Sequence, residues 1–146
     1  MFSLKIVTST TIPYQQKIID YIAKIIWKIV TIPQKWTLNI VFVDTNSIQN
    51  LNKTYRKKDS PTDVLSFHYF DDFSHLKKDD TAWEVILCEE ILKKQALEYN
   101  HSEELEFYRL LIHSTLHILG YDHETDEDYE EMNKIEEEVW REVIAN

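Results

Sequence analysis

Three histidines, His113, His117 and His123, fall within one short stretch that also contains Gly120, the only glycine of the chain. His113 and His117 are four residues apart, so on a helix they stand one above the other on the same face. Gly120 follows where such a helix would end, because glycine readily adopts the left-handed conformation that commonly terminates helices. The stretch therefore predicts a helix, a turn at Gly120, and a third histidine carried back toward the first two.

This arrangement predicts a metal site. Two imidazoles on one helix face and a third from the following segment reach one ion at metal–nitrogen distances of about 2 Å. Three neutral nitrogen ligands without a thiolate favour zinc, with nickel or another divalent transition metal as alternatives. We expect one ion per chain, with a fourth position for water or substrate, which is the pattern of catalytic zinc. The competing interpretation is two core histidines on a buried helix and an unrelated surface histidine.

The spacing of the three histidines and the glycine equals that of the metzincin proteases, whose general base is a glutamate directly after the first histidine. Here that position is Ser114. A serine hydroxyl does not accept a proton near neutral pH as a carboxylate does. The spacing therefore predicts metzincin-like metal binding without peptidase chemistry.

Length and cysteine content set the general class of the protein. The 146 residues predict a single domain over 1–146 with a core of ordinary size. The one cysteine, Cys88, excludes an intramolecular disulfide and predicts a small core residue in a reducing compartment. The chain shows no apolar run of membrane-spanning length and no signal-peptide pattern. We therefore expect a cytoplasmic protein that does not bind membranes.

Charge is distributed unevenly along the chain. The formal net charge is −10, with 26 acidic against 16 basic residues, which argues against broad nucleic-acid binding. Four bases nevertheless gather at Lys53, Arg56, Lys57 and Lys58, which we call the basic segment. A local basic patch near the metal is therefore still expected.

Hydrophobic spacing and turn residues predict four strands and five helices. The strands are expected at 2–9, 37–43, 63–70 and 84–88, and the helices at 13–30, from caps at 44–47 to about 55, and at 89–99, 102–120 and 125–145. Pro13 suits the first helical turn, and Ser102 and Thr125 suit helix caps. This order predicts an α+β domain: one mixed β-sheet of about four strands with helices packed mainly on one side. The histidine-bearing helix, apolar on most sides, should be buried.

Two stretches resemble the YbeY family of bacterial rRNA-maturation endoribonucleases. His113-Ser-Thr-Leu-His-Ile-Leu-Gly-Tyr-Asp-His123 is similar to the family's H-G-x-L-H-L-x-G-Y-D-H. Leu51-Asn-Lys-Thr-Tyr-Arg-Lys-Lys-Asp-Ser-Pro-Thr-Asp-Val-Leu-Ser-Phe67 is similar to L-N-x-x-[YWF]-R-x-x-x-x-P-T-[DN]-V-L-S-F. The helix with Gln95 also looks like the family's, so the likeness spans roughly 37–140. Ser114 replaces the usual glycine, and Trp83-Glu84 replaces the usual Gly-Asp.

The resemblance implies a metal-dependent, single-strand-specific endoribonuclease that matures the 3′ end of small-subunit (16S) rRNA and acts in ribosome quality control. It also implies zinc on the three matched histidines and a functional role for Arg56. The partners implied are single-stranded RNA, rRNA, and the small ribosomal subunit or its associated proteins. The sequence does not predict an oligomeric state.

Residue chemistry suggests a role for each candidate. We expect Arg56 and His113 to be catalytic, because an arginine fork suits a phosphate and the charge that develops on it. Lys53, Lys57 and Lys58 are candidates for binding flanking phosphates. Surface ion pairing is the alternative for Arg56, and solvated loop charge for Lys57 and Lys58. Asp122 and Glu124 are expected to orient an imidazole from behind the metal ligands.

Two other functions stay open from the sequence. One is a metallohydrolase that acts on a peptide or small molecule, which the protease-like spacing favours and the missing glutamate disfavours. The other is a ribosome-associated assembly factor with a mainly structural metal, which the net charge of −10 favours. Metal content and cleavage of single-stranded RNA separate the three.

Overall fold

The elements follow one another in the predicted order, β-α-β-α-β-β-α-α-α, in a computed structural model that describes residues 3–29, 37–68, 81–121 and 125–145. The strands are β1 (Ser3–Ile6), β2 (Thr37–Val43), β3 (Val64–His68) and β4 (Thr81–Cys88). The helices are α1 (Gln16–Ile29), α2 (Thr45–Arg56), α3 (Glu89–Glu98), α4 (Glu103–Ile118) and α5 (Asp126–Ala145).

The four strands form one mixed sheet in the order β1-β2-β4-β3. β1 and β2 are parallel, β2 and β4 are parallel, and β3 runs antiparallel to β4 at the edge of the sheet. The predicted α+β class with one mixed sheet is therefore confirmed. None of the helices in the described part combines the length and apolarity that a bilayer span requires.

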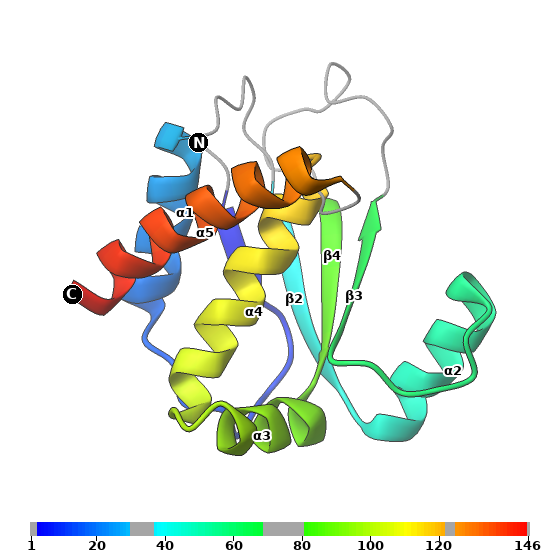
Figure 1. Cartoon of the computed structure of the whole chain (residues 1–146). Coiled ribbons are helices and arrows are strands. Elements are labelled where there is room, and N and C mark those ends of the chain that lie inside the picture. Colours follow the sequence, from blue (N-terminus) through cyan, green and yellow to red (C-terminus); the bar gives the residue numbers. More distant parts are fainter. Residues whose placement is uncertain (1–2, 30–36, 69–80, 122–124, 146) are drawn as a thin grey trace.

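The two faces of the sheet are covered unequally. Residues of β2 alternate between buried and half-buried, so its buried set faces one side. That side packs against α1, α4 and α5 in the larger hydrophobic cluster, and Figure 1 shows α4 and α5 lying across the sheet. On the other face a smaller cluster joins Ile48 of α2 to Leu65, Ile86 and Cys88. Most helices thus lie on one side, as predicted, and Cys88 is a core residue.

Helix α4 is buried on nearly every side. From Glu106 to Ile118 every residue is buried except Arg109, His113 and His117, which are half-buried. These three are spaced by four residues, so they form one line along the helix. The predicted burial of this helix is confirmed, and its accessible line carries two imidazoles and a guanidinium.

The turn after α4 is a Schellman motif at Gly120. Gly120 has φ 102°, its N–H donates to the carbonyl of His117, and the N–H of Tyr121 donates to the carbonyl of Leu116, both at 3.1 Å. The predicted turn is therefore confirmed. The predicted caps are also present, because Asp44, Ser102 and Thr125 each accept a bond from a backbone N–H three residues later.

Several predicted boundaries were wrong. α1 begins at Gln16 rather than with Pro13 in its first turn, because tertiary bonds hold the preceding backbone: Thr11 N donates to Glu89 and Gln15 N to the Tyr108 hydroxyl. The first strand ends at Ile6, short of the predicted 9. β4 begins at Thr81 rather than at 84, because its first residues pair with the start of β2. Residues 69 and 70 of the predicted third strand lie outside the described residues.

Replacing Gly120 with alanine should lower the free energy of unfolding by about 1–2 kcal/mol, because an L-residue at positive φ is strained. A Cβ at this position meets no atom within 4 Å, so the loss reports backbone strain rather than a clash. Asparagine tolerates positive φ better than alanine, so Gly120→Asn should lose less. Urea unfolding measures all three, and equal stability of wild type and Gly120→Ala would contradict the strain.

Candidate functional site

His113 and His117, which we call the histidine pair, lie side by side on the accessible line of α4. Their ring centroids are 4.8 Å apart and the ring planes are inclined at 81°. Two imidazoles that bind one ion at about 2 Å have ring centroids about 5 Å apart. The spacing of the histidine pair therefore fits a shared ion, as the sequence predicts.

Glu136 of α5 holds the ring of His113. Its Oε1 lies 2.6 Å from Nδ1 of His113, and both side chains are about one-third exposed, 33% for the histidine and 28% for the glutamate. A carboxylate can only accept a hydrogen bond, so in the neutral imidazole the proton sits on Nδ1 and the lone pair on Nε2. Carboxylates that orient metal-binding histidines in this way fix the tautomer and raise the basicity of the ligand nitrogen. His113 is thus prepared to bind an ion through Nε2.

The third predicted ligand, His123, lies outside the described residues, as do Asp122 and Glu124, the carboxylates predicted to orient an imidazole. Within the described ranges no three His, Cys, Asp or Glu side chains gather around a common point for an ion. A complete three-histidine site therefore remains a prediction. The described donors, two imidazoles with one tautomer fixed by a carboxylate, have the chemistry that zinc requires.

Ser114, where the metzincins have their catalytic glutamate, faces into its own helix. Its hydroxyl is buried and donates to the carbonyl of Leu110 at 2.8 Å. It therefore neither faces the histidine pair nor serves as a base. The small side chain is accommodated inside the buried part of α4.

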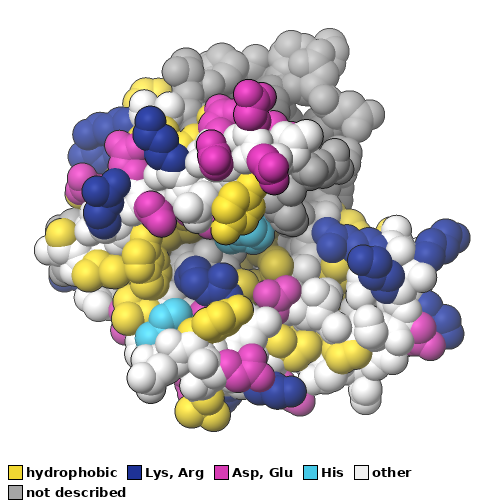
Figure 2. Space-filling model, in the orientation of Figure 1, with side chains coloured by type: hydrophobic (Ala, Val, Ile, Leu, Met, Phe, Trp, Pro, Cys, Tyr) yellow, Lys and Arg dark blue, Asp and Glu magenta, His cyan; other side chains and the backbone are white. Residues whose placement is uncertain are grey.

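The basic segment lies at the end of α2. Lys53, Arg56, Lys57 and Lys58 are all exposed, and Figure 2 shows Lys and Arg side chains gathered over α2. Lys53 makes a distant ion pair with Asp59, at 3.9 Å. Arg56 makes no hydrogen bond or ion pair with any described residue, so the alternative of a surface ion pair gains no support there.

Buried contacts position the end of α2. The side chain of Asn52 is buried and donates from Nδ2 to the carbonyl of Ser60 at 2.9 Å, which ties the helix to the loop after it. The ring of Tyr55, directly before Arg56, packs edge-on against Phe67 of β3, with centroids 5.0 Å apart. The segment that resembles the second family motif is therefore largely a scaffold that fixes where Arg56 leaves the helix.

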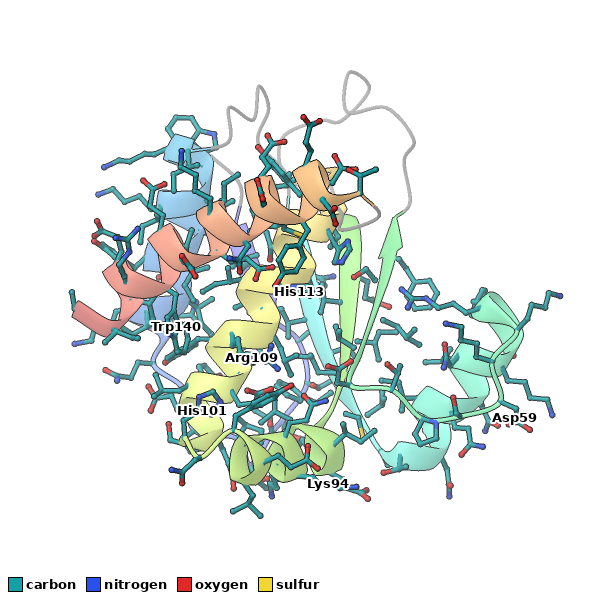
Figure 3. The ribbon with its side chains drawn as sticks, viewed as in Figure 1. Asp59, Lys94, His101, Arg109, His113 and Trp140 are labelled. Carbon is teal, nitrogen blue, oxygen red and sulfur yellow. The ribbon has the colours of Figure 1, made fainter. Side chains whose placement is uncertain are left out.

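The histidine pair and the basic segment come from opposite sides of β3. Figure 3 labels His113 on α4 beneath α5, and Figure 1 draws α2 on the far side of the edge strand. The structure thus brings two of the three predicted metal ligands together on α4, and it places the basic segment at the end of α2, beyond the edge strand β3.

A second polar cluster, centred on Glu106, was not predicted from the sequence. The carboxylate of Glu106 is fully buried and accepts hydrogen bonds from Nε and Nη2 of Arg109, at 2.8 and 2.5 Å. Nε2 of His101 lies 2.6 Å from the same carboxylate. The hydrogen bonds to Glu106 raise the pKa of Arg109 further above its ordinary value. The sequence feature that could have indicated this cluster is the position of Arg109, one helical turn before His113 on the same face of the helix.

Glu136 was missed as well, although the sequence carried a signal for it. The buried residues of α5 recur at helical spacing, at Met132, Ile135, Val139 and Val143. Glu136 falls beside this stripe, one residue after Ile135, where a merely solvated acid is not expected. Because many other residues of α5 are acidic, composition alone does not distinguish Glu136 from the solvated acids around it.

Comparison with known proteins gives a consistent result. The family model described as "Endoribonuclease YbeY" matches residues 5–144. A relative from Fusobacterium nucleatum with that description is 46% identical over 104 residues, which cover 70% of this chain and 64% of the relative. One from Acholeplasma laidlawii is 39% identical over 108 residues, covering 74% and 75%. The aligned part is thus less than two thirds of the Fusobacterium protein.

A solved structure agrees at the level of the whole fold. The solution structure of TM1509 from Thermotoga maritima is 29% identical and superposes with a TM-score of 0.60, covering 100% of this chain and 93% of that one. The predicted fold therefore has an experimentally determined counterpart of similar size.

Glu136→Gln should weaken zinc binding by about 10- to 100-fold, the usual loss when a carboxylate behind a histidine ligand is removed. The amide can still bond to Nδ1, but it no longer stabilises the ring as a charge does. Competition with a chromophoric chelator measures the dissociation constant. The matched control is Glu138→Gln, which makes the same charge change at an exposed position of α5. Equal losses in both variants would show a general charge effect and contradict the role of Glu136.

Proposed function

The chain belongs to the YbeY endoribonuclease family, and on that premise we propose that it is a metal-dependent, single-strand-specific endoribonuclease. Its proposed task is maturation of the 3′ end of 16S rRNA and ribosome quality control. Single-stranded RNA, rRNA and the small ribosomal subunit or its associated proteins are the proposed partners. The proposed location is the cytoplasm, in keeping with the single buried cysteine.

The observation that carries the proposal is the accessible line of α4. A helix otherwise buried from Glu106 to Ile118 exposes two imidazoles at ligand spacing, one of them oriented by Glu136. Burial on the remaining sides limits how far the rings can turn, which is how binding sites are preorganised. Packing alone does not require histidines at these two half-buried positions.

The residues that would hold zinc are His113, His117 and, from the sequence, His123. Bound zinc would supply a Lewis acid that makes water a nucleophile near neutral pH and polarises a phosphoryl oxygen. The work of the chain itself is to keep the proton of His113 on Nδ1, through Glu136. Ser114, with its hydroxyl turned to the helix backbone, takes no part in proton transfer.

Arg56 is the proposed phosphate-binding catalytic residue. It is exposed, permanently charged, and lacks an acidic partner among the described residues, so its full fork is available to a phosphate. Lys53, Lys57 and Lys58 extend the positive charge for flanking phosphates. In a chain of net charge −10, this segment is where an RNA backbone would find attraction.

Three variants test the function. With purified protein and a labelled single-stranded oligoribonucleotide, His113→Ala and His117→Ala should each lose most of the bound metal and nearly all cleavage. Arg56→Ala should keep one equivalent of metal and lose about 100-fold or more in kcat, since it removes a charge that stabilises the transition state. Elemental analysis and a cleavage time course are the measurements, with a duplex of the same sequence as the negative substrate.

Lys58→Ala is the matched control for charge, because it removes an exposed cation two residues from Arg56 and should change mainly the salt dependence of binding. Equal trace cleavage by wild type and all the histidine and arginine variants would indicate a contaminating nuclease and reject the function. Unchanged metal content in folded His117→Ala would reject the site.

An assembly factor with a structural metal is the second candidate, favoured by the acidic exposed face of α5 visible in Figure 2. It predicts that metal removal lowers the free energy of unfolding, while Arg56→Ala leaves every measured property of purified protein unchanged. The proposed endoribonuclease instead requires Arg56 for turnover.

A further inference from the structure

A pocket of about 370 Å³ lies between the end of α3, the middle of α4, and α5. Its volume falls within the range of small-molecule sites, about 300–1,000 Å³. The side chains that matter here are Tyr99, His101, Arg109, Glu136, Glu137 and Trp140. Of these residues, the proposed function uses only Glu136.

The pocket lies next to His113 of the histidine pair. A smaller hollow of about 90 Å³ is lined by His113 and shares Asn133 and Glu136 with the larger pocket. Figure 3 shows Arg109 and His113 following one another along α4, with His101 near the start of the helix and Trp140 of α5 beside them. A strand whose reacting phosphate lies at His113 therefore has a neighbouring site within reach along the helix.

Aromatic rings form one wall of the pocket. The ring of His101 lies 6.1 Å from Tyr99 and 6.3 Å from Trp140, measured between centroids. Trp140 packs its buried side against the core and is only half-buried overall. Every nucleobase has a π-face, so aromatic platforms of this kind bind unstacked bases with little dependence on sequence.

Arg109 is held in a fixed orientation at the floor of the pocket. Glu106 accepts hydrogen bonds from its Nε and one Nη, and the guanidinium carbon lies 4.7 Å from the centroid of the Tyr99 ring. An arginine carries five N–H donors, and within the described part of the chain the remaining ones have no acceptor. Its side chain is 37% exposed, so these donors are open to a ligand acceptor. A base carbonyl or ring nitrogen meets that requirement.

The charge of the pocket selects a base over a phosphate. Glu136 and Glu137 line it, and the charge of Arg109 is already balanced by buried Glu106. A phosphate would face two carboxylates across a half-buried space, whereas the amino and imino groups of a base would find acceptors there. Carboxylates, aromatic rings and a fixed guanidinium together suit a planar group with both donors and acceptors.

We propose that this pocket receives an unstacked nucleobase of the single-stranded substrate, next to the nucleotide cleaved at the histidine pair. The inference rests on the proposed function, since it identifies how that site would select single-stranded RNA. A paired and stacked base cannot enter, so the pocket makes single-strand specificity a property of α4 and α5.

An abasic scan of the substrate tests the pocket. In a short oligoribonucleotide, one nucleotide at a time is replaced by an abasic residue, and KM and kcat are measured with zinc-loaded protein. For wild type, one position at a fixed offset from the cleaved bond should raise KM about 5- to 150-fold, the equivalent of about 1–3 kcal/mol for one stacked base. Trp140→Ala should raise KM of the intact substrate similarly and abolish the effect of that abasic position, because both changes remove one interaction.

Two further variants and a control make the test decisive. Trp140→Phe should restore most of the KM, since an aromatic face is retained. Tyr99→Leu alters an exposed residue and should raise KM in the same direction, which covers failure of Trp140→Ala to fold. Trp27→Phe, on α1, is the control and should leave the abasic profile unchanged. An unchanged KM and profile in folded Trp140→Ala and Tyr99→Leu would overturn the pocket.

Failure of the proposed function gives a different result. If zinc-loaded wild type cleaves no single-stranded RNA, the endoribonuclease assignment fails, and binding of the same oligonucleotides by fluorescence anisotropy decides the pocket separately. Binding that weakens at one abasic position and on Trp140→Ala would still support a base pocket. Binding that is absent, or insensitive to both changes, would overturn it.

Discussion

The packing of α4 between the sheet and α5 is the constraint on which the rest of the structure depends. Between Glu106 and Ile118 the helix gives all but three of its residues to the core, and those three form one line. Because the backbone of a buried helix is fixed by contacts on several sides, a side chain on the remaining line has few directions available. The histidine pair is oriented by hydrophobic burial first, and only then by the bond between His113 and Glu136.

Local signals explain how much of this could be predicted from the sequence. The element order, the burial of α4 and the turn at Gly120 all follow from residue spacing and from the conformational freedom of glycine, which act over a few residues. Asp44 and Ser102 cap their helices as predicted, because capping depends on the next turn alone. Pro13 misled the prediction, because bonds from distant Glu89 and Tyr108 hold the segment before α1 out of the helix.

The residues that sequence reasoning missed act across elements. Glu136 reaches His113 from another helix, and Glu106 joins His101 to Arg109 only because the chain turns between α3 and α4. On α5 an oriented carboxylate and a solvated one look alike in composition, and only helical spacing against Ile135 and Val139 distinguishes them. The predicted roles of His123, Asp122 and Glu124 stay predictions, because these residues lie outside the described part of the chain.

The acidic residues near the proposed RNA-cleaving site follow from this arrangement and do not oppose the proposed function. An imidazole that presents Nε2 to an ion carries its proton on Nδ1, and this N–H needs a hydrogen-bond acceptor. Among protein side chains, an ionised carboxylate is the strongest such acceptor at neutral pH. Glu136 supplies it from α5, so the helix that completes the site also brings negative charge to one side. In the proposed function, phosphates would be attracted to the other side, where the basic segment is exposed, and the acidic side would be left for uncharged bases. In the proposed function, this separation of charge would orient a single strand across α4, which a uniformly basic surface would not do.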